Sequence, residues 1–279
     1  MKRLEGHVIL YDAACPMCNL YTKGFQKAGM LSENGRLAYH QMPDTFACLV
    51  NQDRSVNEIA LVNTTSGKVY YGVESLLQII VHSFPVLGPL SQNHLFRKIA
   101  DKLYKFISFN RRLIIPAEKK EMQNPVLNPS FHQRYRMAYL VFTCLIAAFV
   151  LHRYSLRLHA ILPPSGFGRE LLVCAGQLVW QGVAVRFIDR KKAWDYLGNL
   201  MTISLAGSLL LGGVMMFGNL FSVQNAFFYL VVFAVTVGLM LLEHVRRTRI
   251  LELNWKLSAT WVLYRLVILF LLIFLNYVK

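Results

Sequence analysis

The first 115 residues alternate between short apolar runs and amphipathic helical patterns. Short runs rich in β-branched and aromatic residues predict strands, and apolar positions that recur every three or four residues predict helices. The turn sequence TTSG connects two of the strand-like runs into a hairpin. The predicted strands are residues 8–11, 36–42, 59–63 and 68–71, and the predicted helices are residues 19–28, 45–50, 74–84 and 94–108. This order predicts a small α/β domain over residues 1–115.

The helix predicted at residues 94–108 has one apolar side and one basic side. We expect its apolar side chains to face the core of the domain: Leu95, Ile99, Leu103, Phe106 and Ile107. The basic side chains are expected to form a solvated face, and they could instead rest on acidic lipid headgroups: Arg97, Lys98, Lys102 and Lys105.

The pattern changes after residue 115. Residues 116–136 contain several prolines and the charged stretch AEKKE, which is typical of a linker. Residues 137–279 contain five long apolar runs, and about 20 helical residues cross a hydrocarbon core of about 30 Å. We therefore predict an all-α transmembrane bundle of about five helices. The apolar runs are residues 137–151, 171–188, 196–217, 226–242 and 257–275.

The basic residues between the apolar runs predict the orientation of the chain in a membrane. Basic clusters precede the first run and separate the second from the third and the fourth from the fifth, whereas residues 218–225 carry no Lys or Arg. The positive-inside rule then places the N-terminus in the cytoplasm. The loop that carries Arg153, Arg157 and Arg169 runs against this rule. We expect an integral protein of a bacterial inner membrane, with its N-terminal domain on the cytoplasmic side.

Composition narrows the classes of partner. The chain of 279 residues has a formal net charge of +15, 55% hydrophobic residues and 16% charged residues. A basic balance fits either nucleic acid or an anionic membrane face, and the long apolar runs favour the lipid bilayer over nucleic acid. The five cysteines do not resemble the disulfide framework of a secreted protein. The N-terminal apolar run is too short for a signal peptide and is interrupted by Glu5, Gly6 and His7.

Candidate chemistry lies at Cys15 and Cys18, which form a CPMC motif between the first predicted strand and the first predicted helix. Strand, turn, CxxC and helix follow each other in this order in thioredoxin-like redox sites. The order places Cys15 at a helix N-terminus, where the unpaired N–H groups and the helix dipole stabilise a thiolate. Cys18 lies one turn further on, within reach of a mixed disulfide on Cys15. We predict that Cys15 is the more exposed, attacking thiol and that Cys18 points inward and resolves the mixed disulfide.

Two other interpretations of the CxxC pair remain open. A zinc site commonly has four ligands, and Cys48 with His40 would complete one only if the fold happened to bring them close. Two ordinary reduced thiols are the other alternative. We expect no bound cofactor or metal, only a redox-active cysteine pair. Asp12 could exchange a proton with Cys18, or it could cap the helix through the turn.

Residues Asp12, Cys15 and Cys18, as D-x-x-C-x-x-C within YDAACPMC, resemble the signature of the DCC family of thiol-disulfide oxidoreductase-like proteins. The resemblance includes the hairpin EIALVNTTSGKVYYGVESLLQII and a closing helix, LYKFISFNRR, that ends in Asn-Arg. It implies a thioredoxin/glutaredoxin-like fold and dithiol–disulfide activity. We expect a disulfide of a protein or a small molecule as the substrate. Thioredoxins place a Pro before the strand that faces the CxxC pair. Here residues 55–58, Ser-Val-Asn-Glu, contain none.

The transmembrane region contains polar residues that also invite a function. Arg265 could pair with Glu243, or it could form an anion or quinone site. Gln177 and Gln181 lie four residues apart and could hydrogen-bond between helices or line a cavity. We expect Cys144 and Cys174 to be small apolar fillers, with an intramembrane dithiol relay as the alternative.

These observations give two hypotheses for function. The first is a membrane-anchored thiol-disulfide oxidoreductase whose CPMC dithiol works on the cytoplasmic face. The second is a redox-sensing or docking module that regulates a transporter-like or quinone-binding membrane bundle. Catalytic turnover of a disulfide distinguishes them, because a sensor undergoes one oxidation event rather than repeated cycles.

Overall fold

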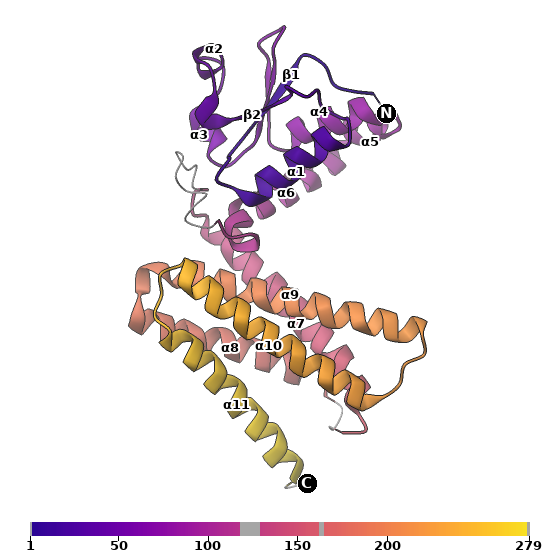
Figure 1. Ribbon diagram of the computed structural model, residues 1–279, viewed down its shortest axis with the longest axis vertical. Coiled ribbons are helices and arrows are strands. Elements are labelled where there is room, and N and C mark those ends of the chain that lie inside the picture. Colours follow the sequence, from indigo (N-terminus) through magenta and orange to yellow (C-terminus); the bar gives the residue numbers. More distant parts are fainter. Residues whose placement is uncertain (1, 118–128, 162–164, 278–279) are drawn as a thin grey trace. The chain divides into compact units, whose positions relative to one another are not determined.

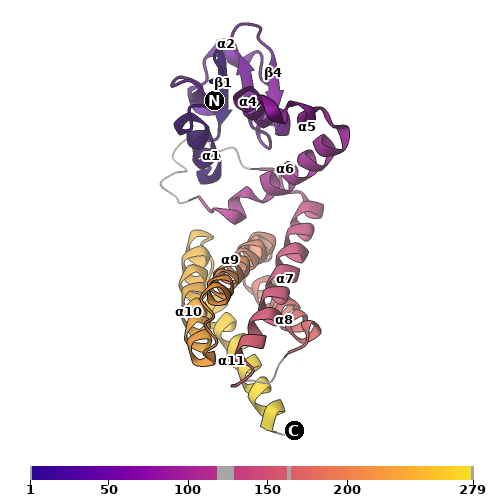
Figure 2. The same ribbon diagram turned by 90° about the vertical axis from the view of Figure 1, so that its right-hand side faces the viewer.

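The computed structural model describes residues 2–117, 129–161 and 165–277. The chain divides into two compact units, Met1–Arg136 and Met137–Lys279, which are described one at a time (Figures 1 and 2). Within the predicted linker, residues 118–128 lie outside the described residues, whereas its last residues are helical and begin helix α7 (Gln133–Ser155).

The first unit is built on a four-stranded mixed sheet with the strand order β2-β1-β3-β4. The central strand β1 (His7–Tyr11) pairs in parallel with β2 (Arg36–Ala38) and antiparallel with β3 (Ala60–Asn63). The edge strand β4 (Val69–Tyr71) closes the predicted hairpin with β3. Strand β2 ends earlier than predicted, because Tyr39–Gln41 form the 3-10 turn η1.

Alternate residues of the central strands supply two separate apolar layers, as the two-residue period of a strand requires. Ile9 and Leu61 face a layer that contains Ile79 of helix α4. Leu10 and Val62 face the opposite layer, with which Val50, Tyr39 and Phe46 pack. The sheet is thus covered on both faces (Figure 1).

Three longer helices cover the first of these faces: α1 (Pro16–Lys27), α4 (Val73–Ser83) and α6 (His94–Ile114). Short helical segments complete the unit: α2 (Asp44–Ala47), α3 (Gln52–Ser55), η2 (Pro85–Leu87) and α5 (Gly88–Gln92). The sequence pattern located α4 to within one residue at each end. Helix α6 continues six residues beyond its predicted end at residue 108, to Ile114.

The orientation expected for α6 is wrong. Leu95, Ile99, Leu103 and Ile107, which we expected to face the core, are 65, 51, 58 and 45% exposed. The inward side of the helix instead presents Tyr104, which packs against the core layer of Ile9 and Leu61, together with the buried Ser108 and Arg111. The sequence pattern located the apolar side of this helix correctly, but that side faces outward.

The second unit is helical, and its described residues include long apolar helices that are candidate membrane spans. Together with the sheet of the first unit, it confirms the predicted fold class, an α/β domain followed by a helical region with five long apolar helices. These helices are α7 (Gln133–Ser155), α8 (Phe167–Ile188), α9 (Ala193–Leu220), α10 (Ala226–Ile250) and α11 (Lys256–Tyr277).

Hydrogen bonds between polar side chains connect the long helices. The Tyr196 hydroxyl of α9 donates to Gln181 of α8 at 2.7 Å and lies 3.0 Å from His244 Nε2 of α10. Thr260 of α11 also donates to the Gln181 side chain, at 3.2 Å. Gln181 therefore connects three helices, which is the interhelical role that we considered for it.

Arg265 does not pair with Glu243 as we expected. Glu243 is engaged by Arg246 and Arg247 of its own helix, both at 2.7 Å. Arg265 donates to the side-chain oxygen of Gln177 at 2.9 Å and stacks over Trp261. The two cysteines of this region, Cys144 and Cys174, are buried in one apolar cluster where α7, α8 and α9 meet.

Candidate active site

The CPMC motif lies at the junction of β1 and α1, as predicted. After Tyr11 the chain turns, and the Cys15 amide donates to the carbonyl oxygen of Asp12 at 3.1 Å. Cys15 has an extended backbone and is the N-cap of α1, while Pro16 takes the first helical turn, where its missing N–H group costs nothing. The Cys15 Sγ accepts a hydrogen bond from the Cys18 amide at 3.5 Å. An N–H group of the first helical turn, which has no partner within the helix, therefore donates to the Cys15 sulfur.

The electrostatics of the site separate the two thiols. A hydrogen bond from the Cys18 side chain, together with the positive charge of Arg111 and the Cys18 amide, lowers the pKa of Cys15 from 9.0 to about 6, although burial opposes the change. The same side-chain hydrogen bond, together with burial, raises the pKa of Cys18 well above 9.0. At neutral pH, Cys15 is therefore mostly a thiolate, and Cys18 is the thiol that donates to it.

The predicted difference in exposure between the two cysteines is wrong. Cys15 is 0% exposed, whereas Cys18 is 5% exposed. Cys15, which we predicted to attack the substrate, thus has a lowered pKa but no exposed surface. Cys48, in contrast, is exposed at the C-terminal end of α2.

Asp12 is buried and forms ion pairs with the end of α6. Its Oδ2 lies 3.3 Å from Arg112 and 3.7 Å from Arg111, and its Oδ1 accepts the Ala14 amide at 3.1 Å. The bond to Ala14 stabilises the turn that precedes α1, while the helix N-cap is Cys15 itself. Asp12 therefore ties the CxxC turn to a helix that lies about 100 residues later in the chain.

The segment before β3, where thioredoxins carry their proline, is also held by α6. The carbonyl oxygen of Val56 accepts a hydrogen bond from Arg111 at 3.0 Å, and that of Asn57 accepts one from the Ser108 hydroxyl. One turn earlier on the same helix, the Tyr104 hydroxyl accepts the Ile59 amide at 2.8 Å. Three side chains of α6 thus fix residues 56–59 opposite the cysteines.

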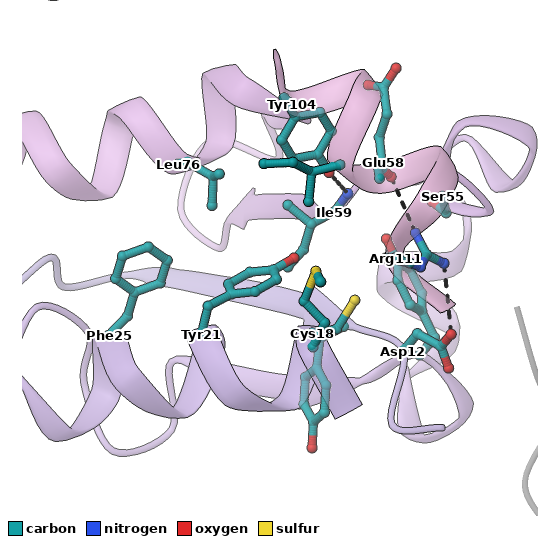
Figure 3. A pocket seen from close by; sticks show the side chains of 15 residues that line it. Asp12, Cys18, Tyr21, Phe25, Ser55, Glu58, Ile59, Leu76, Tyr104 and Arg111 are labelled. Atoms are coloured by element: carbon teal, nitrogen blue, oxygen red, sulfur yellow. Dashed lines mark hydrogen bonds and ion pairs between the residues drawn. The ribbon is translucent and has the colours of Figure 1, made fainter. Parts of the chain in front are cut away.

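A cavity of about 230 Å³ lies between α1, α6 and the segment before β3, and Cys18 rather than Cys15 lines it. In Figure 3 the side chains of Tyr21 and Cys18 point from α1 towards Ile59 and Tyr104. Most of the lining is aromatic or aliphatic, with Arg111 and Asp12 at one end. The lining residues are Tyr11, Asp12, Met17, Cys18, Tyr21, Phe25, Tyr39, Ser55, Glu58, Ile59, Leu76, Tyr104, Ile107, Ser108 and Arg111.

The structure therefore brings together the three residues predicted from sequence, Asp12, Cys15 and Cys18, and adds others that we had not assigned to the site. Of these, Tyr104, Ser108 and Arg111 recur every three or four residues, so they share one face of α6. This row of Tyr104, Ser108 and Arg111 is separate from the apolar side of the amphipathic helix and was visible in the sequence. It was a signal that the helix turns this side, and not its apolar side, towards the sheet.

Comparison with protein-family models matches residues 9–115 to the DCC1-like thiol-disulfide oxidoreductase model. This match confirms the resemblance found in the sequence, and it covers the sheet, the CPMC turn and helix α6. The rest of the chain is the region with five candidate membrane spans. No curated protein and no solved structure matches the chain.

Proposed function

We propose that the chain is a membrane-anchored enzyme that exchanges thiols and disulfides through Cys15 and Cys18, because residues 9–115 match the DCC1-like thiol-disulfide oxidoreductase model. The observation that carries the proposal is the position of Cys15 as the N-cap of α1, where its sulfur accepts the Cys18 amide at 3.5 Å and its pKa is lowered by Cys18 and Arg111. A thiolate is the form of cysteine that attacks disulfides.

In the proposed reaction, the Cys15 thiolate attacks one sulfur of a substrate disulfide. A Cys15–substrate disulfide forms, the substrate S–S bond breaks, and the released sulfur leaves as a thiolate that takes up a proton. Cys18 then loses its proton and attacks the Cys15 sulfur, so that the substrate leaves as a dithiol and the pair becomes a disulfide. A cellular thiol reductant must reduce this disulfide before the next cycle.

The surroundings of Cys18 suit the second step. Once Cys15 is in a mixed disulfide, it no longer carries the charge that holds the Cys18 proton. The Tyr21 hydroxyl and the Arg111 charge both lower the pKa of Cys18, so they favour the thiolate that performs the resolving attack. Cys15 is enclosed, so the first step requires a local opening at the CPMC turn to admit a protein or small-molecule disulfide.

For location, we propose the cytoplasmic face of a bacterial inner membrane. Three basic clusters then lie on the cytoplasmic side of five spans, as the positive-inside rule favours. The cytoplasm is poised to keep thiols reduced, so the favoured direction is reduction of the substrate.

The test is disulfide turnover by the full chain in detergent or nanodiscs, with a thiol reductant and a model disulfide. Cys15→Ser should abolish turnover, and Cys18→Ser should hold the substrate as a mixed disulfide on Cys15. Cys48→Ser is the matched control, because this cysteine is free, exposed and outside the site. Full turnover by Cys15→Ser would refute the proposal.

A redox sensor is the second candidate, and the complete burial of Cys15 favours it over an open exchange site. A sensor would be oxidised once and slowly, and its membrane helices would change behaviour without repeated reduction of a substrate. Many turnovers per protein molecule would exclude this role, whereas a single stoichiometric oxidation would support it.

A further inference from the structure

Helix α6 presents an apolar stripe to the surroundings of the first unit. The stripe consists of Leu95, Ile99, Leu103 and Ile107, which recur every four residues over three turns and are each 45 to 65% exposed. Four apolar side chains in the segment just before the helix are exposed as well: Phe84, Val86, Leu87 and Leu90 are 44, 90, 38 and 47% exposed. A regular exposed stripe of this size on one helix marks an interaction surface.

Leu95, Ile99 and Leu103 belong to neither apolar layer of the sheet, because α6 packs on the sheet with its other side, and only Ile107 also lines the cavity of the site. Tyr104 reaches the core layer, and Ser108 and Arg111 bond to the carbonyl groups of residues 56 and 57. Turning the stripe inward would expose these buried polar groups and break the ion pair of Arg111 with Asp12. The outward direction of the stripe is thus fixed by the site.

The charge beside the stripe indicates what it contacts. Lys98 and Lys102 are exposed and flank the stripe along one edge, whereas Lys105, one turn further on, is paired with Asp101 at 2.9 Å. An apolar stripe bordered by lysines is the pattern of a helix that lies in the interface of an anionic bilayer, with the apolar side chains among the acyl chains and the ammonium groups among the headgroups. The chain also supplies its own bilayer, because α6 ends at Ile114 and the first candidate span begins at Gln133.

We propose that α6 docks through this stripe onto the anionic phospholipid surface of the membrane that the chain spans. The docked helix lies along the surface, and Lys98 and Lys102 contact the phosphate groups of the headgroups. The redox domain is then held at the membrane surface by lipid contacts as well as by the connection to α7. This proposal is independent of the redox chemistry and concerns only how the domain is held.

The test measures access of water-soluble maleimide to two introduced thiols in the full chain. Leu103→Cys places a thiol in the stripe, and Gln52→Cys places one on exposed helix α3 as an internal control, with Cys48→Ser removing an exposed native thiol. The chain is reconstituted into nanodiscs of phosphatidylcholine alone or of phosphatidylcholine mixed with phosphatidylglycerol. Labelling at each position is followed by peptide mass spectrometry, so the native cysteines do not interfere.

Docking predicts that labelling of Leu103→Cys relative to Gln52→Cys slows at least ~10-fold in the anionic nanodiscs and much less in phosphatidylcholine. Adding Lys98→Gln and Lys102→Gln should weaken docking by ~25-fold, since each lysine contributes about a fivefold factor at an anionic surface. Labelling in the anionic nanodiscs should then recover. High salt should act in the same direction.

Three results would overturn the proposal. Equal slow labelling in both lipids would mean that a protein surface covers the stripe. Equal fast labelling in both would mean that the stripe is uncovered. If Leu103→Cys stays protected in the anionic nanodiscs after both lysines are substituted, the lysines do not contact the headgroups and the proposal is wrong. None of these results depends on disulfide turnover, so the redox proposal stands or falls separately.

Discussion

Replacing Cys18 with alanine removes the hydrogen bond that does most to lower the pKa of Cys15. The change from 9.0 to about 6 in that pKa corresponds to ~4 kcal/mol in favour of the thiolate. A hydrogen bond to a charged acceptor contributes ~1.5–3 kcal/mol, which is equivalent to about 1–2 in pKa. We therefore expect Cys18→Ala to raise the pKa of Cys15 to ~7–8, with the helix N-terminus and Arg111 supplying the remainder.

The assay is the pH profile of Cys15 alkylation, followed by mass spectrometry of the peptide that contains it. The midpoint of the profile is the quantity to compare, because a less acidic thiolate is also a better nucleophile and the rate at one pH can mislead. Below its pKa the thiol is protonated and unreactive, so the wild-type rate should fall as the pH drops through about 6.

Cys18→Ser is the matched control, because its hydroxyl keeps a donor at the same position. Its midpoint should stay closer to the wild-type value than that of Cys18→Ala. The reasoning is refuted if Cys18→Ala leaves the midpoint near pH 6, since the acidity of Cys15 would then come from the helix and the arginines alone. It is also refuted if both variants raise the midpoint equally, since a side-chain donor at position 18 would then make no difference.

Three further predictions concern positions away from the sulfurs. Asp12→Asn removes the carboxylate that holds two arginines of α6, and it should lower the free energy of unfolding of the domain by ~3 kcal/mol, seen as faster hydrogen exchange at the end of α6. Tyr196→Phe removes the hydroxyl that links Gln181 and His244, and it should cost ~1–2 kcal/mol, measured as a lower Tm in detergent. Gly72→Ala should lower the free energy of unfolding by about 1–3 kcal/mol, measured by urea titration, because Gly72 has a φ of +58° and a Cβ there would lie 3.2 Å from the Glu58 side chain. Unchanged stability in any of these three variants would contradict the contact from which its prediction is drawn.

The strands and helices of the first unit were predictable because they depend on local patterns. Alternation along β1 sends Ile9 and Leu10 to opposite layers, and the apolar repeat of α4 marks its length. The position of Cys15 at a helix start follows from Pro16 and the strand before it. Each of these features is set by residues only a few positions apart.

The direction of α6 was not predictable from its amphipathic pattern alone. A helical stripe shows which side is apolar, but a lipid surface and a protein core favour the same residues. The polar face of Tyr104, Ser108 and Arg111 carried the missing information, because buried polar groups require partners and the sheet supplies them.

The enclosure of Cys15 and the partner of Arg265 depend on contacts between distant segments. Arg111 and Arg112 reach Asp12 from the far end of the domain, and the CxxC spacing carries no sign of it. Arg265 was expected to find Glu243, the nearest carboxylate in the pattern. Arg246 and Arg247 lie three and four residues from Glu243 on the same helix, so they form the ion pairs with it. Arg265 donates a hydrogen bond to Gln177 instead.

The two sides of α6 have a structural consequence. Ile107 lies on the outward stripe and Arg111 in the redox site, one turn apart on the same 21-residue rod. The backbone of α6 is continuous between the two positions, so the side chains on its outer side and the guanidinium beside Asp12 and Cys15 belong to one helical segment.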